Sequence, residues 1–131
     1  MPDGCHVKPE QFFNLIFGYH DRYSATKTEF NPGGAPISLI LPAVDPGEVW
    51  VLNTFWGMNG TRDDNIQLKV NAGGEIHYLA YGPSGGAARP IIWNGAIPLK
   101  QGDTLFVTFW ANQAGDDLYC GALGSKMKLT Q

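Results

Sequence analysis

Basic residues are scarce in this 131-residue chain, and nowhere do they form a run. The sequence has 9 Lys and Arg against 12 Asp and Glu, which gives a formal net charge of -3 at pH 7. A protein that neutralises a row of phosphates needs a basic patch, because its contacts to the nucleic-acid backbone are electrostatic. The scarcity of positive charge therefore argues against nucleic acid as a partner.

Long apolar segments are also missing. No uninterrupted apolar run reaches the length of about 20 residues that a helix needs to cross a bilayer. Residues 1–8 lack the basic start and the apolar core of a secretory signal peptide. From these features we expect a soluble protein that has no membrane partner and is made in a cytoplasm.

Cysteine occurs twice, as Cys5 and Cys120, almost a whole chain apart. Neither neighbourhood has the spacing of a metal-binding or redox motif. The sequence allows either a disulfide between these residues or two reduced thiols. We favour reduced thiols, because disulfides are rare in proteins that stay in a cytoplasm.

Side chains that could converge on a substrate are few. His6, His20 and His77 are scattered rather than set at metal-ligand spacing, and no serine has the context of a nucleophile. The acidic pairs at residues 63–64 and 116–117 could bind a hard cation such as calcium, but they follow no EF-hand pattern. We therefore expect no enzymatic activity, no cofactor and no resident metal.

Glycine and proline, by contrast, are abundant, at 17 and 9 residues, and they show no repeat period. Together with 44% hydrophobic residues, they suit one packed domain of short strands and frequent turns. From residue 23 onward, turn residues separate about eight strand-like segments, and no strong helical pattern occurs. We predict an all-β fold, an antiparallel β-sandwich of jelly-roll or related Greek-key topology.

The most strand-like part of the chain is residues 91–112, which we predict to form a core hairpin. Its turn lies at residues 100–103, because Gly102 and Asp103 tolerate turn conformations. A second hairpin is expected around the turn at residues 71–74. The expected strands cover residues 23–30, 37–41, 48–56, 65–70, 75–81, 90–93 with 96–99, 105–110, and 118–123 with 126–129.

The start of the chain lacks the pattern of strands separated by turn residues that begins at residue 23. We therefore expect an N-terminal arm at residues 1–22 and a single domain at residues 23–131. Within the arm, residues 11–17 could form a short helix or a strand. The aromatic side chains of this segment need burial, either on their own domain or on a neighbouring subunit: Phe12, Phe13 and Phe17.

Two strand-like segments carry more aromatic surface than one core face requires. Strict alternation places Trp50, Leu52, Thr54 and Trp56 on one face of residues 48–56. In residues 105–110 it places the uniformly apolar set Leu105, Val107 and Phe109 on one face, and Phe106 and Trp110 on the other. A thick core, a subunit interface and a sugar-stacking platform would each account for the surplus. The candidate interface residues are Phe12, Phe13, Phe17, Trp50, Trp56, Phe106 and Trp110.

Two of these segments also carry a recognisable pattern. Residues 46–52 read Pro-Gly-Glu-Val-Trp-Val-Leu, and residues 93–105 read Trp-Asn-Gly-Ala-Ile-Pro-Leu-Lys-Gln-Gly-Asp-Thr-Leu. The pattern resembles small β-sandwich virion proteins of tailed bacteriophages, namely capsid decoration or cement proteins, head fibres and tail-associated proteins. The resemblance covers roughly residues 36–129 and implies no catalytic residue.

The resemblance implies a non-enzymatic virion protein, most simply a capsid decoration or cement protein that binds and stabilises the assembled phage head. Its expected partner is the major capsid protein or another virion protein, and it is expected to form a homo-oligomer after synthesis in the host cytoplasm. The alternative is a carbohydrate-binding or receptor-binding module of a phage tail or fibre. A small jelly-roll enzyme is disfavoured, because the His, Asp and Glu residues form no ligand cluster.

Overall fold

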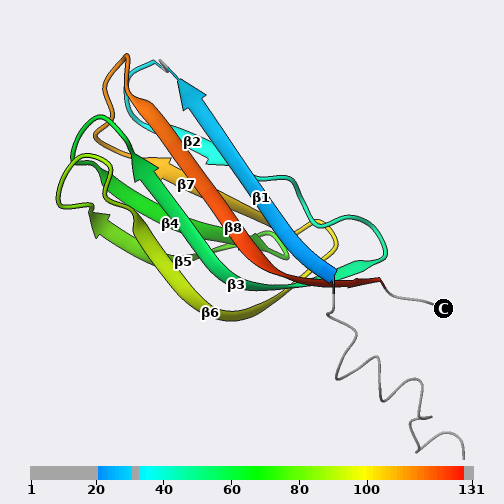
Figure 1. Cartoon of the computed structure of the whole chain (residues 1–131). Coiled ribbons are helices and arrows are strands. Elements are labelled where there is room, and N and C mark those ends of the chain that lie inside the picture. The colour runs from blue at the N-terminus through cyan, green and yellow to red at the C-terminus, as the bar shows by residue number, and fades with distance from the viewer. Residues whose placement is uncertain (1–20, 31–32, 129–131) are drawn as a thin grey trace, which may run out of the picture.

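Eight β-strands make up the part of the chain that the computed structural model describes, residues 21–30 and 33–128 (Figure 1). The all-β prediction is confirmed, and the described ranges contain no helix that could span a membrane. The helix or strand expected at residues 11–17 lies outside these ranges. The strands are β1 (Asp21–Phe30), β2 (Ile37–Ile40), β3 (Glu48–Asn59), β4 (Asn65–Ala72), β5 (Glu75–Pro83), β6 (Ile91–Lys100), β7 (Thr104–Phe109) and β8 (Asp117–Lys128).

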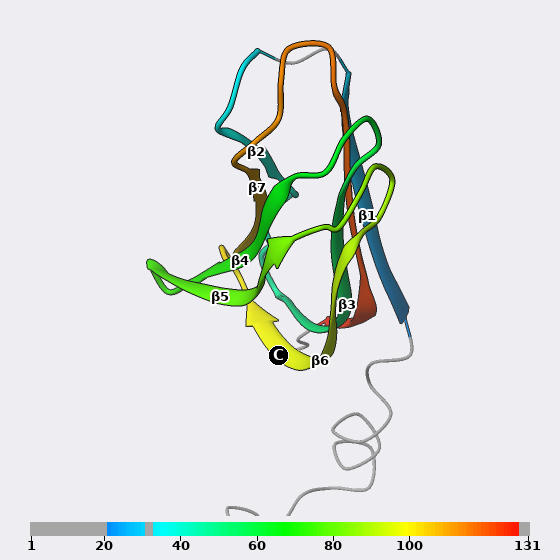
Figure 2. The same ribbon diagram turned by 90° about the vertical axis from the view of Figure 1, so that its left-hand side faces the viewer.

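The strands form two four-stranded sheets that pack as two layers. Sheet I has the order β1-β8-β3-β6 and sheet II has the order β2-β7-β4-β5. Each pairing is antiparallel, and β1 pairs with β8, β2 with β7, β3 with β6 and β4 with β5. This is the order of an eight-stranded jelly roll, one of the two topologies predicted. Figure 2 shows the two sheets as separate layers.

Alternate residues of each strand fill the core between the sheets. In β7, Leu105, Val107 and Phe109 point inward and are buried, as the alternation predicted. At sheet I, the ring of Trp50 stacks on Tyr23 with 4.1 Å between ring centroids. Burial of these side chains supplies the main stabilisation of the sandwich.

A β-bulge at Asn53 changes which residues of β3 face inward. The register with both neighbouring strands shifts between Leu52 and Thr54. Trp50 and Leu52 are therefore buried in the core, whereas Thr54 and Trp56 are only partly buried and point outward. The prediction that these four residues share one face is wrong, because strict alternation fails where an extra residue enters a strand.

The two strands predicted within residues 91–112 exist, but they do not form a hairpin with each other. β6 pairs with β3 in sheet I, whereas β7 pairs with β2 and β4 in sheet II. The predicted turn carries the chain between the sheets: Gly102 has φ 88°, and Asp103 Oδ2 accepts a hydrogen bond from Lys100 N at 3.0 Å. The sequence marks this turn correctly but does not identify the partner of either strand.

The hairpin predicted around residues 71–74 does form. It joins β4 and β5, and Gly73 and Gly74 adopt φ 61° and 85°. Two consecutive positive φ angles give a tight turn whose twist matches that of the flanking strands.

β8 continues without a break through Gly124, although the expected strand pieces, residues 118–123 and 126–129, leave residues 124–125 between them. Gly124 pairs with Leu52 beside the Asn53 bulge. A Cβ atom on Gly124 would overlap the carbonyl oxygen of Val51. β3 and β8 thus approach each other too closely at this point for any side chain.

We expect Gly124→Ala to lower the free energy of unfolding by about 2 kcal/mol or more, because β3 and β8 must separate to admit the methyl group. Urea unfolding measures the change. Gly34→Ala is the matched control, since no atom lies within 4 Å of a Cβ built there. If both variants unfold at the wild-type midpoint, the close approach of the two strands is not required for stability.

Candidate functional site

Buried polar side chains close one end of the sandwich. Asn59 at the end of β3 donates hydrogen bonds from Nδ2 to Asp64 Oδ2 at 2.9 Å and to Asp116 Oδ2 at 3.0 Å. Arg62 Nε donates to the two Asp116 carboxylate oxygens at 2.8 and 2.7 Å. This cluster connects the end of β3 to the loops that precede β4 and β8.

The electrostatics of this cluster suit a structural role rather than a catalytic one. The hydrogen bond from Arg62 is the largest of the effects that lower the pKa of Asp116 to about 2, and the hydrogen bond from Asn59 adds to it. Asp116 is completely buried and stays ionised at neutral pH. A general acid or base needs a pKa near the working pH, so this carboxylate is unsuited to proton transfer.

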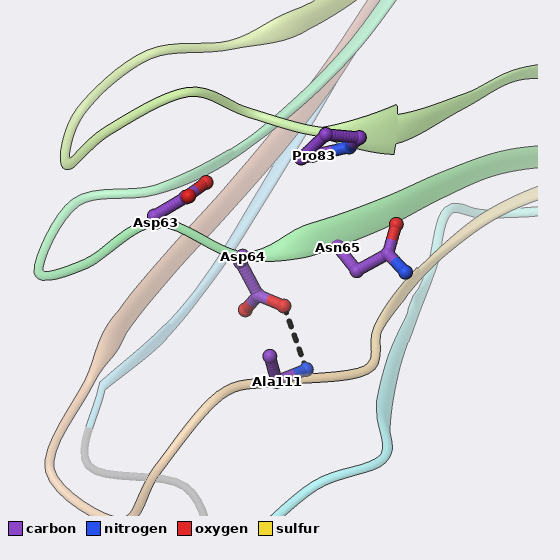
Figure 3. Close-up of a pocket in the computed structure, with 5 residues that line it drawn as sticks. All are labelled: Asp63, Asp64, Asn65, Pro83 and Ala111. Atoms are coloured by element: carbon purple, nitrogen blue, oxygen red, sulfur yellow. Dashed lines mark hydrogen bonds between the residues drawn. The ribbon is translucent and has the colours of Figure 1, made fainter.

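A hollow of about 310 Å³ lies beside the cluster (Figure 3). Asp64 Oδ1 accepts a hydrogen bond from Ala111 N at 2.7 Å, and Asp63 Oδ1 accepts from Ser84 Oγ and from Gly85 N at 2.9 Å each. Three of the four carboxylates considered for calcium thus hold loops together: Asp63, Asp64 and Asp116. Over residues 21–30 and 33–128, no group of three His, Cys, Asp or Glu side chains could hold a metal ion. The hollow is lined by Asp63, Asp64, Asn65, Pro83 and Ala111.

The outer surface of sheet II, which we call face II, combines aromatic rings with amide and hydroxyl groups. Tyr81 is 72% exposed, Tyr78 54% and Trp110, just after β7, 49%. Gln67 and Asn65 on β4 lie between the tyrosines and Trp110. Its other outward-facing residues are Ser38, Ile40, Lys69, Asn71, Ile76, Pro83, Thr104, Phe106 and Thr108.

Lys69 is the one charged residue among the described outward-facing positions of face II, and aromatic rings cover it. Its Nζ lies 4.7 Å from the ring centroid of Phe106 and 5.6 Å from that of Tyr78. The residue is 8% exposed, and burial lowers the pKa of its amine. The surface that face II offers to a ligand is therefore nearly free of charge.

A second bulge creates face II. Strict alternation along β5 would send Tyr78 and Tyr81 to opposite faces. Leu79 is left out of the pairing with β4, so Tyr78 lies opposite Lys69 and Tyr81 opposite Gln67. Both rings therefore point outward, edge to face, with 6.1 Å between their centroids. The sequence alone did not point to these tyrosines, because nothing local to β5 signals the bulge.

The outer surface of sheet I, which we call face I, is more apolar. Ile92 and Leu123 are 52% and 46% exposed. Trp56 lies opposite Ile92 and Gly121, and a Cβ on Gly121 would meet the Trp56 indole at 2.6 Å, so the indole covers β8 at this point. The three central rows of face I carry no charged residue: Ser24, Thr26, Thr28, Thr54, Trp56, Met58, Ile92, Asn94, Tyr119, Gly121 and Leu123.

The candidate interface residues fall in different places. Trp56 lies on face I, and Phe106 and Trp110 lie on face II. Trp50 is 6% exposed in the core, so its side chain does not reach the surface of this chain. The three remaining candidates lie outside the described residues, and their role stays a prediction: Phe12, Phe13 and Phe17.

The two segments that resemble phage proteins lie side by side in the fold. Val49 of the first pairs with Lys100 of the second. Just before the first segment, Val44 N donates to the carbonyl oxygen of Asp103 at 3.0 Å. The shared pattern thus builds the end of the sandwich where the chain passes from β6 in sheet I to β7 in sheet II, and it describes the fold rather than a binding face.

No family model matches the chain, and neither does any curated protein. Among solved structures, the chain is similar to one of infectious bursal disease virus Gx strain, with a TM-score of 0.42 and 10% identity over 82% of this chain and 33% of that one. The Gt strain of that virus gives a TM-score of 0.36 and 15% identity, over 85% of this chain and 32% of that one. The chain thus spans about a third of the length of these viral chains.

The chain is also similar to the N-terminal cellulose-binding domain of a Cellulomonas fimi β-1,4-glucanase, with a TM-score of 0.38 and 9% identity. The match covers 87% of this chain and 92% of that domain. At TM-scores and identities this low, none of the three likenesses identifies a family or a ligand.

We expect Asp116→Asn to lower the free energy of unfolding by about 2 kcal/mol at neutral pH, because it removes the charge of the buried carboxylate that accepts hydrogen bonds from the partly exposed Arg62. Asp117→Asn, which changes the adjacent and partly exposed carboxylate, is the control. Urea unfolding of both variants at pH 7 measures the difference. A loss of the same size in both variants would contradict a special role for Asp116.

The same ion pair predicts a pH dependence. The native pKa of Asp116, about 2, is below the ordinary value of 3.8. Its stabilising contribution is therefore complete above about pH 4 and is lost as the pH falls through about 2. The difference in stability between the wild type and Asp116→Asn should shrink over this interval. A difference that stays constant down to pH 2 would show that the charge on Asp116 is not its source.

Proposed function

We propose that this protein is a non-enzymatic structural component of a virion, a decoration or cement protein that binds the assembled head of a tailed phage. The observation that carries the proposal is face I. Its central rows carry no charge, and Trp56, Ile92 and Leu123 lie together on it. The cores of protein interfaces are depleted in charged residues and enriched in aromatic ones, so face I suits contact with another protein.

The resemblance of residues 46–52 and 93–105 to phage virion proteins directs the proposal to a phage head. The proposed partner is the major capsid protein or a neighbouring virion protein, and several copies of this chain would act together on one particle. Neither nucleic acid nor a membrane is proposed as a partner. A protein that binds the assembled shell but not its free subunits stabilises the shell by mass action.

The proposal gives the N-terminal arm a defined place. β1, which begins at Asp21, is an edge strand of sheet I, so the chain that precedes it is attached at the border of face I. Contacts of this segment with a neighbouring virion protein would add Phe12, Phe13 and Phe17 to the same interface. A chain lacking residues 1–20 should then bind particles more weakly than the full chain.

We expect Ile92→Asp and Leu123→Asp to remain folded, because both side chains are about half exposed. Each should lower binding to purified heads at least about tenfold, because a charge is desolvated at the contact. Co-sedimentation with heads of the encoding phage that lack this protein measures binding. Ile76→Asp is the control, since it adds the same charge at a similarly exposed isoleucine on β5 of the opposite sheet.

Heads that carry the protein should also withstand more heat or chelator than heads that lack it. Head binding by both face I variants at the wild-type level would contradict face I as the interface. Absence of the protein from purified heads would contradict the cement function itself. That second outcome would favour the alternative, a carbohydrate-binding or receptor-binding module of a tail or fibre.

A further inference from the structure

Face II differs from face I in the kind of surface it presents. Its exposed rings belong to Tyr78, Tyr81 and Trp110, and the amides of Asn65 and Gln67 lie between them. Aromatic rings stack on the apolar faces of sugar rings, and amides exchange hydrogen bonds with hydroxyl groups. We propose that face II binds a neutral oligosaccharide, with Tyr81 and Trp110 as stacking platforms and Gln67 and Asn65 as polar contacts.

The spacing of the two platforms fits a chain of sugars rather than a single one. Gln67 pairs with Tyr81 on one side and with Thr108 on the other. Trp110 N donates to Asn65 O at 3.0 Å, which places Trp110 one row further along β7. Tyr81 and Trp110 are thus two strands and one row apart, roughly 12 Å from the strand spacing and rise.

The polar groups between the platforms have free hydrogen-bonding capacity. Gln67 Oε1 is buried and has no hydrogen-bond partner among the described residues, so the amide must turn outward before this oxygen can meet a ligand. Asn65 is exposed at the start of β4, beside the hollow that its side chain helps to line (Figure 3). Thr108, in contrast, is already paired with Ser38 through their hydroxyl oxygens at 2.8 Å. A hydroxyl-rich ligand can both donate to and accept from the exposed Asn65, and it can donate to Gln67 once that amide turns outward.

The charges around face II favour a neutral ligand over an acidic one. The ammonium group of Lys69 lies against Phe106 and Tyr78 and is poorly placed to meet a carboxylate or sulfate above the rings. Asp63 and Asp64, in the loop before β4, are held by loop hydrogen bonds, and only Asp63 is exposed. Among the described outward-facing positions of face II, an acidic polysaccharide would therefore meet no accessible cation.

Face I and face II lie on opposite sides of the sandwich, as the two layers in Figure 2 show. A copy attached to a shell through face I would leave face II free for a glycan. The inference does not rest on the proposed function, because it uses only residues of sheet II and the loops beside it. The proposed glycan site and the proposed attachment to a shell can therefore fail independently.

Titration calorimetry of the full chain with cellohexaose, chitohexaose and maltohexaose, backed by an array of neutral glycans, tests the proposal. We expect binding to at least one of these ligands, with a weaker response to hyaluronan fragments of similar length. Tyr81→Ala and Trp110→Ala should each reduce the affinity at least about tenfold, and Gln67→Ala should reduce it severalfold. Circular dichroism confirms that each variant is folded.

His77→Ala is the matched control. His77 lies on the same strand as Tyr81 and is also exposed, but it pairs with Val70 and does not belong to face II. The His77→Ala variant should bind the glycans with the affinity of the wild type. Absence of binding to every neutral glycan at millimolar concentration would overturn the proposal. So would glycan binding that survives both Tyr81→Ala and Trp110→Ala, or head binding that is lost in these variants without any glycan binding.

Discussion

The contact between β3 and β8 at the Asn53 bulge is the constraint on which the exposed surface of sheet I depends. The extra residue in β3 reverses the side on which later side chains of that strand lie, and Gly124 lets β8 approach closely enough to keep pairing past it. Trp50 therefore stacks in the core, while Trp56 covers the outside of the same sheet. Without the bulge, Trp56 would compete for space already filled by core side chains.

The second bulge, at Leu79, has the same effect on sheet II. It turns Tyr78 and Tyr81 to one side, where they join Phe106 and Trp110. The two irregularities thus produce two aromatic outer faces of different character, one apolar and uncharged, the other mixed with amides. Because both lie on strands, their side chains are held by backbone pairing rather than by flexible loops, which lowers the entropic cost of binding.

The buried polar cluster at one end of the sandwich stabilises loops, whereas the two outer faces are the proposed binding surfaces. Asn59, Arg62, Asp64 and Asp116 satisfy one another and the loops around them, so the carboxylates in this region are committed to the fold. Such a network holds the loops that border face II at the start of β4 and the end of β7. Acidic loop residues alone did not reveal this role, since the same residues also match what a hard cation would need.

The sequence by itself determined the fold class, the single hairpin turn at residues 71–74, and the inward sets of regular strands such as Leu105, Val107 and Phe109 in β7. These features follow from local turn chemistry and from period-two alternation, both of which are visible in neighbouring residues. Only the tertiary structure decided that β6 and β7 belong to different sheets, that Trp50 is buried and Trp56 is not, and that Tyr78 and Tyr81 share a face. Strand partners and bulges depend on contacts between residues far apart in the chain, and a bulge of one residue reverses every orientation that follows it.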